Sequence, residues 1–242
     1  MSNAIQASLL TLSQSVAFLL ICSSALAQGD RAPEVDQRPR VEKLDDGTYR
    51  LGKIAFDQKT REVSFAAKVN MNLGYLEYIL VNEVTGKTHE SLLTTEVSPM
   101  DLNVVLLLLG YKPSSVLANQ TEDKPLPVEP KASFDVMVKW KDSDGKGHTA
   151  PVESWVLNLA TESPAVRGHW LYTGSKVDDQ GGFAAETDGS IIAVYRDLRS
   201  LINNPREGKT SDEIWKPSTD QGLPPKETPL TIFLRPHAPE QK

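Results

Sequence analysis

The chain has a single cysteine among its 242 residues, and that residue, Cys22, lies close to the N-terminus. One cysteine cannot form a disulfide within the chain, and no residue after position 22 can act as a thiol nucleophile. Basic residues are in the minority, since 26 Lys and Arg against 32 Asp and Glu give a formal net charge of −6. The two signs are interspersed, and without a basic stripe we expect no nucleic-acid binding.

Long hydrophobic runs are also lacking. The apolar block at residues 16–22 is far shorter than the roughly 20 residues that span a bilayer, so we predict no membrane span. The first 27 residues carry no charged side chain and end on the small-x-small run 25–27 (ALA). This pattern predicts a signal peptide over residues 1–27, cleaved after Ala27. An N-terminal core helix is the alternative, but a core helix has no reason to stop at a cleavage pattern.

Cys22 does not indicate a lipoprotein, because Ile21 precedes it where a lipobox requires a small residue. The segment before Val16 lacks Lys and Arg, which departs from the usual signal-peptide pattern. Cleavage after Ala27 would leave a chain without cysteine. Eukaryotic secreted domains of this size often carry disulfides, so we expect a bacterial periplasmic or secreted protein.

The rest of the chain predicts one globular domain. Residues 28–46 are polar and contain prolines, so we expect a flexible lead-in. Residues 47–236 have the length of one ordinary domain, and residues 237–242 form a polar tail. A core of this size requires no metal or disulfide for stability.

Strand patterns dominate this domain. Residues 63–69 alternate with a period of two, and residues 75–81 are apolar on both faces except at Glu77. We expect residues 83–87 to form a hairpin turn and residues 88–97 to return as the antiparallel partner. Further strand patterns follow at residues 134–140, 152–159, 170–177, 183–187, 190–195 and 230–234.

Two helices are expected. Ser98 is a good N-cap, Gly110 a good stop, and the intervening residues are apolar nearly all round, which predicts a deeply buried helix. Asp197 is expected to cap a second, short helix. The predicted fold class is therefore α+β: predominantly antiparallel β-structure with one buried helix packed on the sheet and a second short helix. The long Pro-rich loop at 205–229 is the candidate functional loop.

The candidate site lies in the run GKTHES at residues 86–91. His89, Glu90 and Ser91 combine imidazole, carboxylate and hydroxyl groups at the start of a predicted strand. In a strand His89 and Ser91 face one side and Glu90 the other, so other segments would have to complete a catalytic relay. His89 and Glu90 are also candidate metal ligands if further ligands converge on them. The alternative is a structural role, with His89 fixing the turn.

Glu77 is the fourth candidate residue, because a carboxylate within an apolar strand must be paired, kept neutral or turned to solvent. The spacing of Asp142, Asp144, Gly147 and Glu153 imitates a calcium loop. However, Lys146 stands at a ligand position and the flanks are strands, so we interpret the run as a hairpin turn. His148, His169 and His237 are scattered, and no nucleotide-binding or hydrolase motif occurs.

Six runs of sequence resemble the YdjY-domain family of exported bacterial proteins. They are residues 63–70 (VSFAAKVN), 74–78 (GYLEY), 87–93 (KTHESLL), 106–110 (LLLLG), 189–195 (GSIIAVY) and 203–206 (NNPR). The similarity covers about residues 50–236. It implies an exported bacterial protein and draws attention to His89, Glu90 and Ser91. It implies no activity, substrate or cofactor.

We therefore expect a non-enzymatic binding or accessory module that meets a protein or small-molecule partner in the cell envelope. No cofactor is expected. The alternative is a metal-dependent or acid–base hydrolase centred on His89 and Glu90, with Glu77 as a further candidate group. A third interpretation makes His89 and Ser91 a structural clamp.

Overall fold

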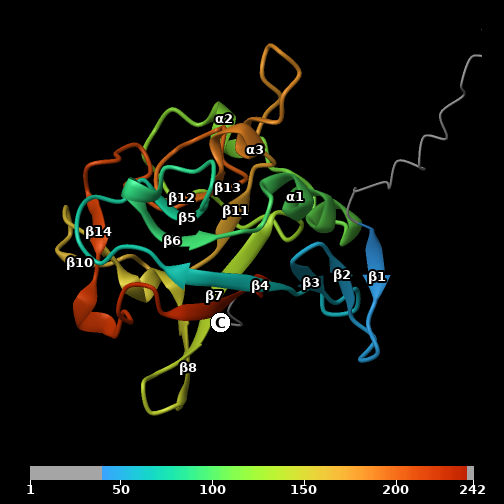
Figure 1. Ribbon diagram of the computed structural model, residues 1–242. Helices are drawn as coiled ribbons and strands as arrows, with labels where there is room; N and C mark the ends of the chain where they lie inside the picture. The colour runs from blue at the N-terminus through green and yellow to red at the C-terminus, as the bar shows by residue number, and fades with distance from the viewer. Residues whose placement is uncertain (1–39, 239–242) are drawn as a thin grey trace, which may run out of the picture. The chain divides into compact units, whose positions relative to one another are not determined.

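Strands dominate the computed structural model, which describes residues 40–238 (Figure 1). The predicted signal peptide, residues 1–27, and most of the lead-in lie outside this range. The strands are β1 (Val41–Lys43), β2 (Tyr49–Leu51), β3 (Ile54–Phe56), β4 (Val63–Val69), β5 (Tyr78–Asn82), β6 (Ser91–Thr95), β7 (Ser133–Lys141), β8 (Gly147–Pro151), β9 (Val156–Asn158), β10 (Ser163–Pro164), β11 (Trp170–Tyr172), β12 (Ser190–Ala193), β13 (Ile202–Asn203), β14 (Trp215–Pro217) and β15 (Pro229–Pro236). The α-helices are α1 (Pro99–Leu108), α2 (Val116–Asn119) and α3 (Ala184–Asp188), and the 3-10 helices are η1 (Thr88–Glu90), η2 (Val152–Trp155) and η3 (Thr219–Gln221).

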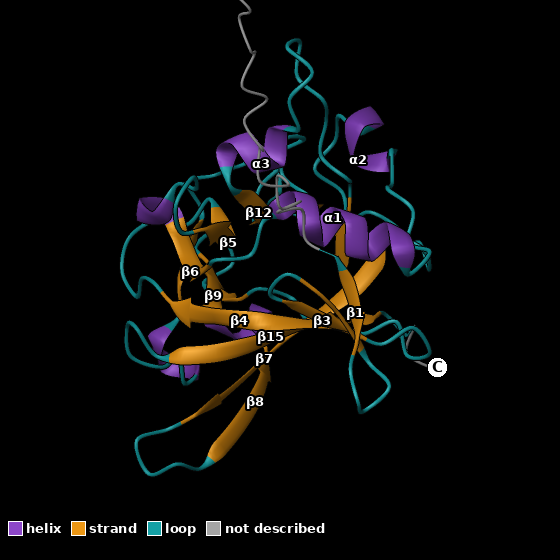
Figure 2. Ribbon diagram, turned by 45° about the vertical axis from the view of Figure 1, so that its right-hand side comes forward, coloured by secondary structure: helices purple, strands orange, loops and turns teal. Residues whose placement is uncertain are grey.

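Eight strands close into a barrel. The order β4-β15-β7-β11-β13-β12-β5-β6 runs round the sheet, and β6 pairs back onto β4 (Figure 2). The predicted α+β arrangement, an antiparallel sheet with a helix packed on it, is therefore wrong. Local patterns along the chain could not reveal closure, because it depends on the pairing of strands from distant parts of the sequence.

The direction in which β5 pairs with β6 also differs from the prediction. These strands run parallel, with Tyr78 opposite Ser91, although the sequence predicted an antiparallel hairpin. The turn does form, since the Gly86 N–H donates to the Asn82 carbonyl. The residues after the turn form the 3-10 helix η1, which returns the chain to the start of β5. There the Glu77 N–H donates a hydrogen bond to the Glu90 backbone carbonyl.

The predicted alternation in β4 is confirmed. Its inward side chains are buried, and those facing the other way are partly or fully exposed. On one side β4 pairs with residues 229–234 of β15, from Lys68 opposite Pro229 to Val63 opposite Leu234. β15 also pairs with β7, so the last strand lies between an early and a middle strand of the chain. Leu230, Ile232 and Leu234 of β15 add to the core.

Helix α1 begins as predicted, because Ser98 Oγ accepts a hydrogen bond from the Asp101 N–H. Its deep burial was predicted wrongly. Leu102, Val105 and Leu106 are buried, whereas a second apolar face of Met100, Val104, Leu107 and Leu108 is 37–54% exposed. An apolar pattern on all sides of a helix cannot show which side meets the core.

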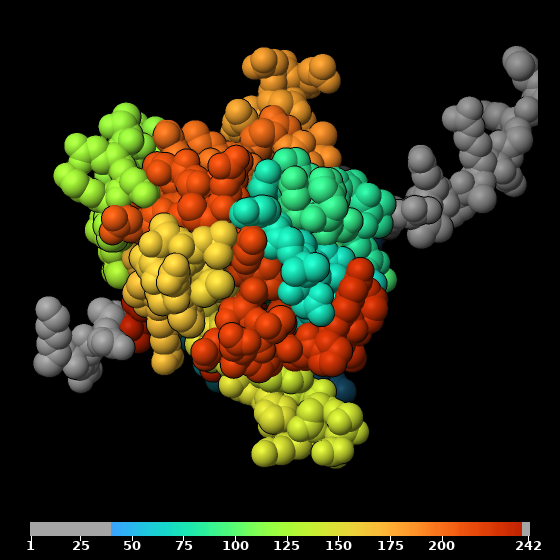
Figure 3. Space-filling view, turned by 90° about the vertical axis from the view of Figure 1, so that its left-hand side faces the viewer, coloured from blue at the N-terminus to red at the C-terminus, as the bar shows by residue number. Residues whose placement is uncertain are grey.

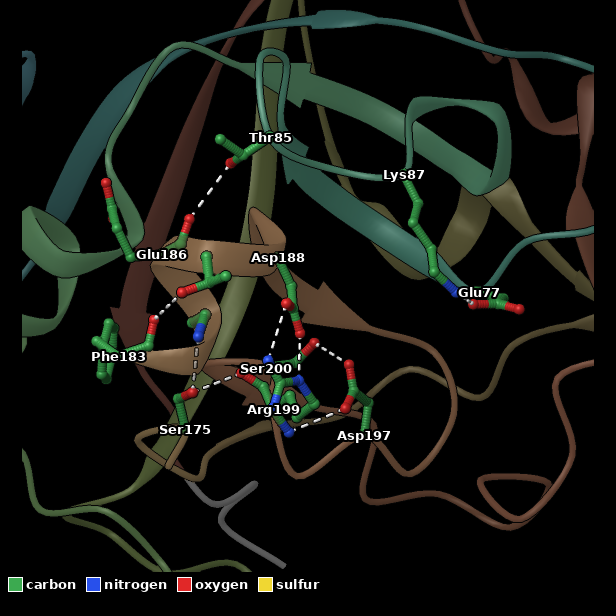
Figure 4. A network of polar contacts seen from close by, with 12 residues as sticks. Glu77, Thr85, Lys87, Ser175, Phe183, Glu186, Asp188, Asp197, Arg199 and Ser200 are labelled. Carbon is green, nitrogen blue, oxygen red and sulfur yellow. Dashed lines mark hydrogen bonds and ion pairs between the residues drawn. The ribbon is translucent and has the colours of Figure 1, made fainter. Parts of the chain in front are cut away.

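The second helix expected at Asp197 does not form. Asp197 instead holds a turn, in which its carboxylate accepts hydrogen bonds from the Arg199 N–H and the Ser200 hydroxyl (Figure 4). Part of the segment predicted as a strand at residues 183–187 is helix α3. Arg199 pairs with Asp188 at the end of α3, so the turn and the helix support each other (Figure 4).

A smaller sheet, β10-β9-β14, accompanies the barrel. Trp155 and Trp215 are buried within the main core cluster, which joins the two sheets through one continuous set of apolar contacts. The long loop predicted at residues 205–229 contains β14 and η3, so it is partly ordered structure. Its first residues form part of the site described below.

Candidate functional site

The structure brings two of the four predicted site residues close to each other. His89 Nε2 lies 3.6 Å from Glu90 Oε1, and the His89 side chain is 74% exposed. Ser91 is fully buried, and its hydroxyl donates to the Leu93 carbonyl at 2.8 Å. The Ser91 hydroxyl is therefore engaged with its own strand.

Glu77 joins this group through Lys87. The Lys87 ammonium lies 2.8 Å from Glu77 Oε2 (Figure 4). It also lies 3.4 Å from Glu90 Oε2. The hydrogen bond to Glu77 and the nearby carboxylates raise the pKa of Lys87 above its ordinary value. Within residues 40–238, no group of three or more His, Cys, Asp or Glu side chains is arranged to hold a metal ion. The cluster is thus a charged network at the edge of a shallow acidic hollow lined by Tyr75, Glu77, Glu90, Asp212 and Glu213.

The calcium-like run is a hairpin, as predicted. Asp142 Oδ1 accepts hydrogen bonds from the backbone of the turn that joins β7 to β8. Its other oxygen lies 2.7 Å from His148 Nε2. Glu153, the last position of the apparent loop, lies in η2 and pairs with Arg206.

A second hollow, a pocket of about 490 Å³, lies elsewhere on the surface. Four segments form its wall: residues 123–126, 158–169, 205–208 and 214–215. Figure 3 shows this side, where the yellow segment around residue 160 lies against the orange-red segment that follows residue 200. The volume falls within the range of ordinary ligand pockets. We call it the Arg206 pocket.

Arg206 is the organising residue of this wall. Its Nη2 donates to Glu153 Oε1 at 2.5 Å and to the Gly168 carbonyl at 2.8 Å, and its Nε donates to the Val166 carbonyl. The guanidinium also lies 4.7 Å from the centre of the Trp170 ring. A single buried side chain thus fixes the 166–168 segment against η2.

Burial shifts the pKa values of the ionisable groups around Arg206. Burial raises the pKa of Glu153, and the Arg206 charge acts against this shift. Burial likewise lowers the pKa of Arg206, and Glu153 opposes the change. His169 lines the same pocket, and burial, aided by the nearby Arg206 charge, lowers its pKa to about 4. His169 is therefore neutral near pH 7.

Asp123 anchors the opposite part of the wall. Its Oδ2 accepts from the Gly208 N–H at 2.8 Å, and its Oδ1 lies 3.4 Å from the buried Lys209 ammonium. Gly208 has a φ of +90°, and a Cβ there would lie 2.8 Å from the Trp215 ring. Only glycine satisfies both the backbone angle and the close approach.

Sequence reasoning missed the Arg206 pocket, although a signal was present. The run NNPR at residues 203–206 belongs to the family resemblance, and the predicted functional loop at residues 205–229 supplies the lining residues 205–208 and 214–215. The Asn203 side chain accepts a hydrogen bond from the Asp197 N–H at its Oδ1 and donates one from its Nδ2 to Thr173 Oγ1. Asn204 Oδ1 accepts a hydrogen bond from Arg206 Nη1. The two asparagines thus shape the turn that directs Arg206 inward.

The chain matches the family model of the YdjY domain over residues 54–235. No curated protein and no solved structure matches it. Within residues 40–238, no helix has the length and apolarity that crossing a membrane requires. The matched segment runs from β3 to β15 and includes every part of the Arg206 pocket. The chain belongs to the YdjY domain family.

Proposed function

We propose that this chain is a non-enzymatic ligand-binding module of the bacterial cell envelope, with the Arg206 pocket as its binding site. One observation carries the proposal: a pocket of about 490 Å³ whose wall combines apolar surface with a few fixed polar groups. Leu126, Ile214 and Trp215 supply the apolar part. The location in the envelope is supported by the charge-free N-terminal 27 residues and their cleavage pattern.

The polar groups of the wall favour binding over catalysis. Arg206 is tied to Glu153, Gly168 and Val166, and Asp123 is tied to Gly208 and Lys209. A catalytic acid or base must exchange a proton with its substrate, whereas these groups already serve neighbouring parts of the wall. Fixed groups of this kind suit recognition, because a rigid site loses little entropy when a ligand binds.

The proposal is tested by fluorine-detected NMR with a set of anionic, cationic and neutral fluorinated fragments. Thr161 lies at the exposed rim of the pocket, so Thr161→Trp should block the pocket without disturbing the core. Val84→Trp is the matched control, since Val84 is 84% exposed on a turn outside the pocket. We expect a subset of fragments to bind the wild type and the control but not Thr161→Trp. Identical binding by all three proteins would refute the proposal.

A further inference from the structure

The wall of the Arg206 pocket carries no net formal charge. Two cations and two anions line it: Arg167, Arg206, Asp123 and Glu207. The two innermost charges are also neutralised from behind, because Glu153 pairs with Arg206 and Lys209 pairs with Asp123. A charged ligand would lose its hydration on entry, and the wall as a whole would offer it no net charge in return. This balance favours an uncharged ligand.

The pocket nevertheless presents a hydrogen-bond donor. Asn158 Oδ1 accepts from the Ala160 N–H at 2.9 Å, which fixes the orientation of the side-chain amide. Its Nδ2 group makes no hydrogen bond to any residue in the range 40–238, and Asn158 is one of the residues that line the pocket. The N–H groups of Asn158 are therefore available to a carbonyl oxygen of a ligand.

An acceptor lies beside this donor. The Asp123 carboxylate accepts from Gly208 and Lys209, but an ionised carboxylate has about four acceptor positions. Gly208 lies between the two groups: its N–H is 2.8 Å from Asp123 Oδ2, and its missing Cβ would be 3.4 Å from Asn158 Nδ2. Gly208 itself places no side chain between the donor and the acceptor.

A donor and an acceptor that both lie near Gly208 match the chemistry of a peptide backbone, which offers both a C=O and an N–H. A hydrocarbon chain would cover Asn158 and Asp123 without replacing their water contacts, which is costly. Trp215 is only 2% exposed, so it offers no open ring face on which a sugar could stack. The apolar part of the wall includes Leu126, Ile214 and three prolines at positions 125, 164 and 205.

We propose that the Arg206 pocket binds an uncharged, apolar peptide segment of a partner protein. The peptide carbonyl accepts from Asn158 Nδ2, a peptide N–H donates to Asp123, and apolar side chains contact Ile214 and Leu126. This inference rests on the proposed function, since it names the ligand class of the same pocket. It predicts that either charge on a short peptide-like probe weakens binding.

Three matched probes test the ligand class by NMR titration of the protein. N-acetyl-leucine N-methylamide is neutral, N-acetyl-leucine is anionic, and leucine N-methylamide is cationic, and all three share one side chain. We expect the neutral probe to bind at the pocket and each charged probe to bind about tenfold more weakly or not at all, since burying a charge without a partner is unfavourable.

Asn158→Asp tests the role of the donor. The new carboxylate keeps an acceptor for the Ala160 N–H but removes the N–H groups that face the ligand. The loss of one hydrogen bond should weaken the neutral probe about fivefold or more. Asn119→Asp is the matched control, because it makes the same change at an exposed position outside the pocket. If Asn158→Asp fails to fold, Thr161→Trp should abolish binding of the neutral probe instead.

The outcomes separate this inference from the proposed function. Charged probes that bind the pocket as tightly as the neutral one overturn the peptide inference, as does unchanged affinity in Asn158→Asp. If fluorinated fragments bind the pocket but none of the three probes does, the ligand class is wrong and the binding module stands. If neither fragments nor probes bind, both proposals fail.

Discussion

The Arg206 guanidinium and the Glu153 carboxylate form a buried ion pair across 53 positions of sequence, with 2.5 Å between Nη2 and Oε1. The pair joins η2 to the segment that follows β13, and Trp170 Nε1 donates to the same Glu153 oxygen at 3.1 Å. Since Arg206 also holds the backbone carbonyls of residues 166 and 168, the pair and the pocket wall depend on each other.

Arg206→Ala should lower the free energy of unfolding by about 3–5 kcal/mol, because it leaves the Glu153 carboxylate buried without its partner. Urea titration measures the loss. A double-mutant cycle with Glu153→Gln should give a coupling of about 0.5–3 kcal/mol. Arg50→Ala, which breaks an exposed pair with Glu42, serves as the control and should change little. Strict additivity of Arg206→Ala and Glu153→Gln would contradict the pairing.

His169 should make stability depend on pH. Folding lowers its pKa from 6.5 to about 4, so between these values the unfolded chain binds a proton that the folded chain does not. The contribution is therefore complete above pH 6.5 and is lost as the pH falls towards 4. Because the ring is only partly buried, we expect about 1–2 kcal/mol between pH 7 and pH 4.5.

Denaturation of His169→Gln across the same pH range isolates this contribution from the carboxylates, which also titrate in acid. The variant should lose less stability than the wild type as the pH falls. Parallel stability curves for the two proteins would show that His169 is as easily protonated in the folded chain as in the unfolded one.

The two faces of α1 should respond differently to truncation. Leu106 is fully buried, so Leu106→Ala should cost about 2–5 kcal/mol through lost contacts and a cavity. Leu107 is 49% exposed, and Leu107→Ala should cost less than about 1 kcal/mol. Both values come from urea denaturation of otherwise identical proteins. Equal losses would mean that both faces of the helix are covered.

His89→Ala should leave the free energy of unfolding within about 0.5 kcal/mol of the wild type, because the ring is largely exposed. Metal analysis should give the same zinc content for both proteins, since no third ligand stands beside His89 and Glu90 within residues 40–238. About one zinc per chain, lost in His89→Ala, would instead support the hydrolase alternative.

Gly208→Ala should reduce both stability and probe binding. The backbone angle of +90° costs an alanine about 1–2 kcal/mol, and its Cβ would press on Trp215 at 2.8 Å. Gly145→Ala is a matched control for the angle, since it has a φ of +78° and open space around the missing Cβ. A larger loss at Gly208 than at Gly145 measures the cost of the contact with Trp215.

Local features of this fold followed from sequence, and long-range ones did not. The alternation at Val63, Phe65 and Val69 and the cap at Ser98 were predicted correctly because they depend on neighbouring residues. The parallel course of β5 and β6 was missed because η1, rather than the turn, decides the direction of return. The barrel was missed because its closure rests on pairing between distant strands.

The same distinction applies to the site. His89, Glu90 and Ser91 drew attention because they are adjacent in sequence, whereas the Arg206 pocket combines segments more than 80 positions apart. Arg206 and Glu153 belong to no shared motif, and Asn158 resembles any strand-end asparagine. Only the fold shows that these side chains share one wall.

The position of β15 has a consequence for how the chain reaches its native state. β15 pairs with both β4 and β7, so neither of those ladders can form until residues 229–236 have been synthesised. The barrel therefore cannot close before residues 229–236 take their place between β4 and β7. Such dependence on long-range contacts also slows folding. Deleting this one C-terminal strand should leave an unfolded chain rather than a smaller domain.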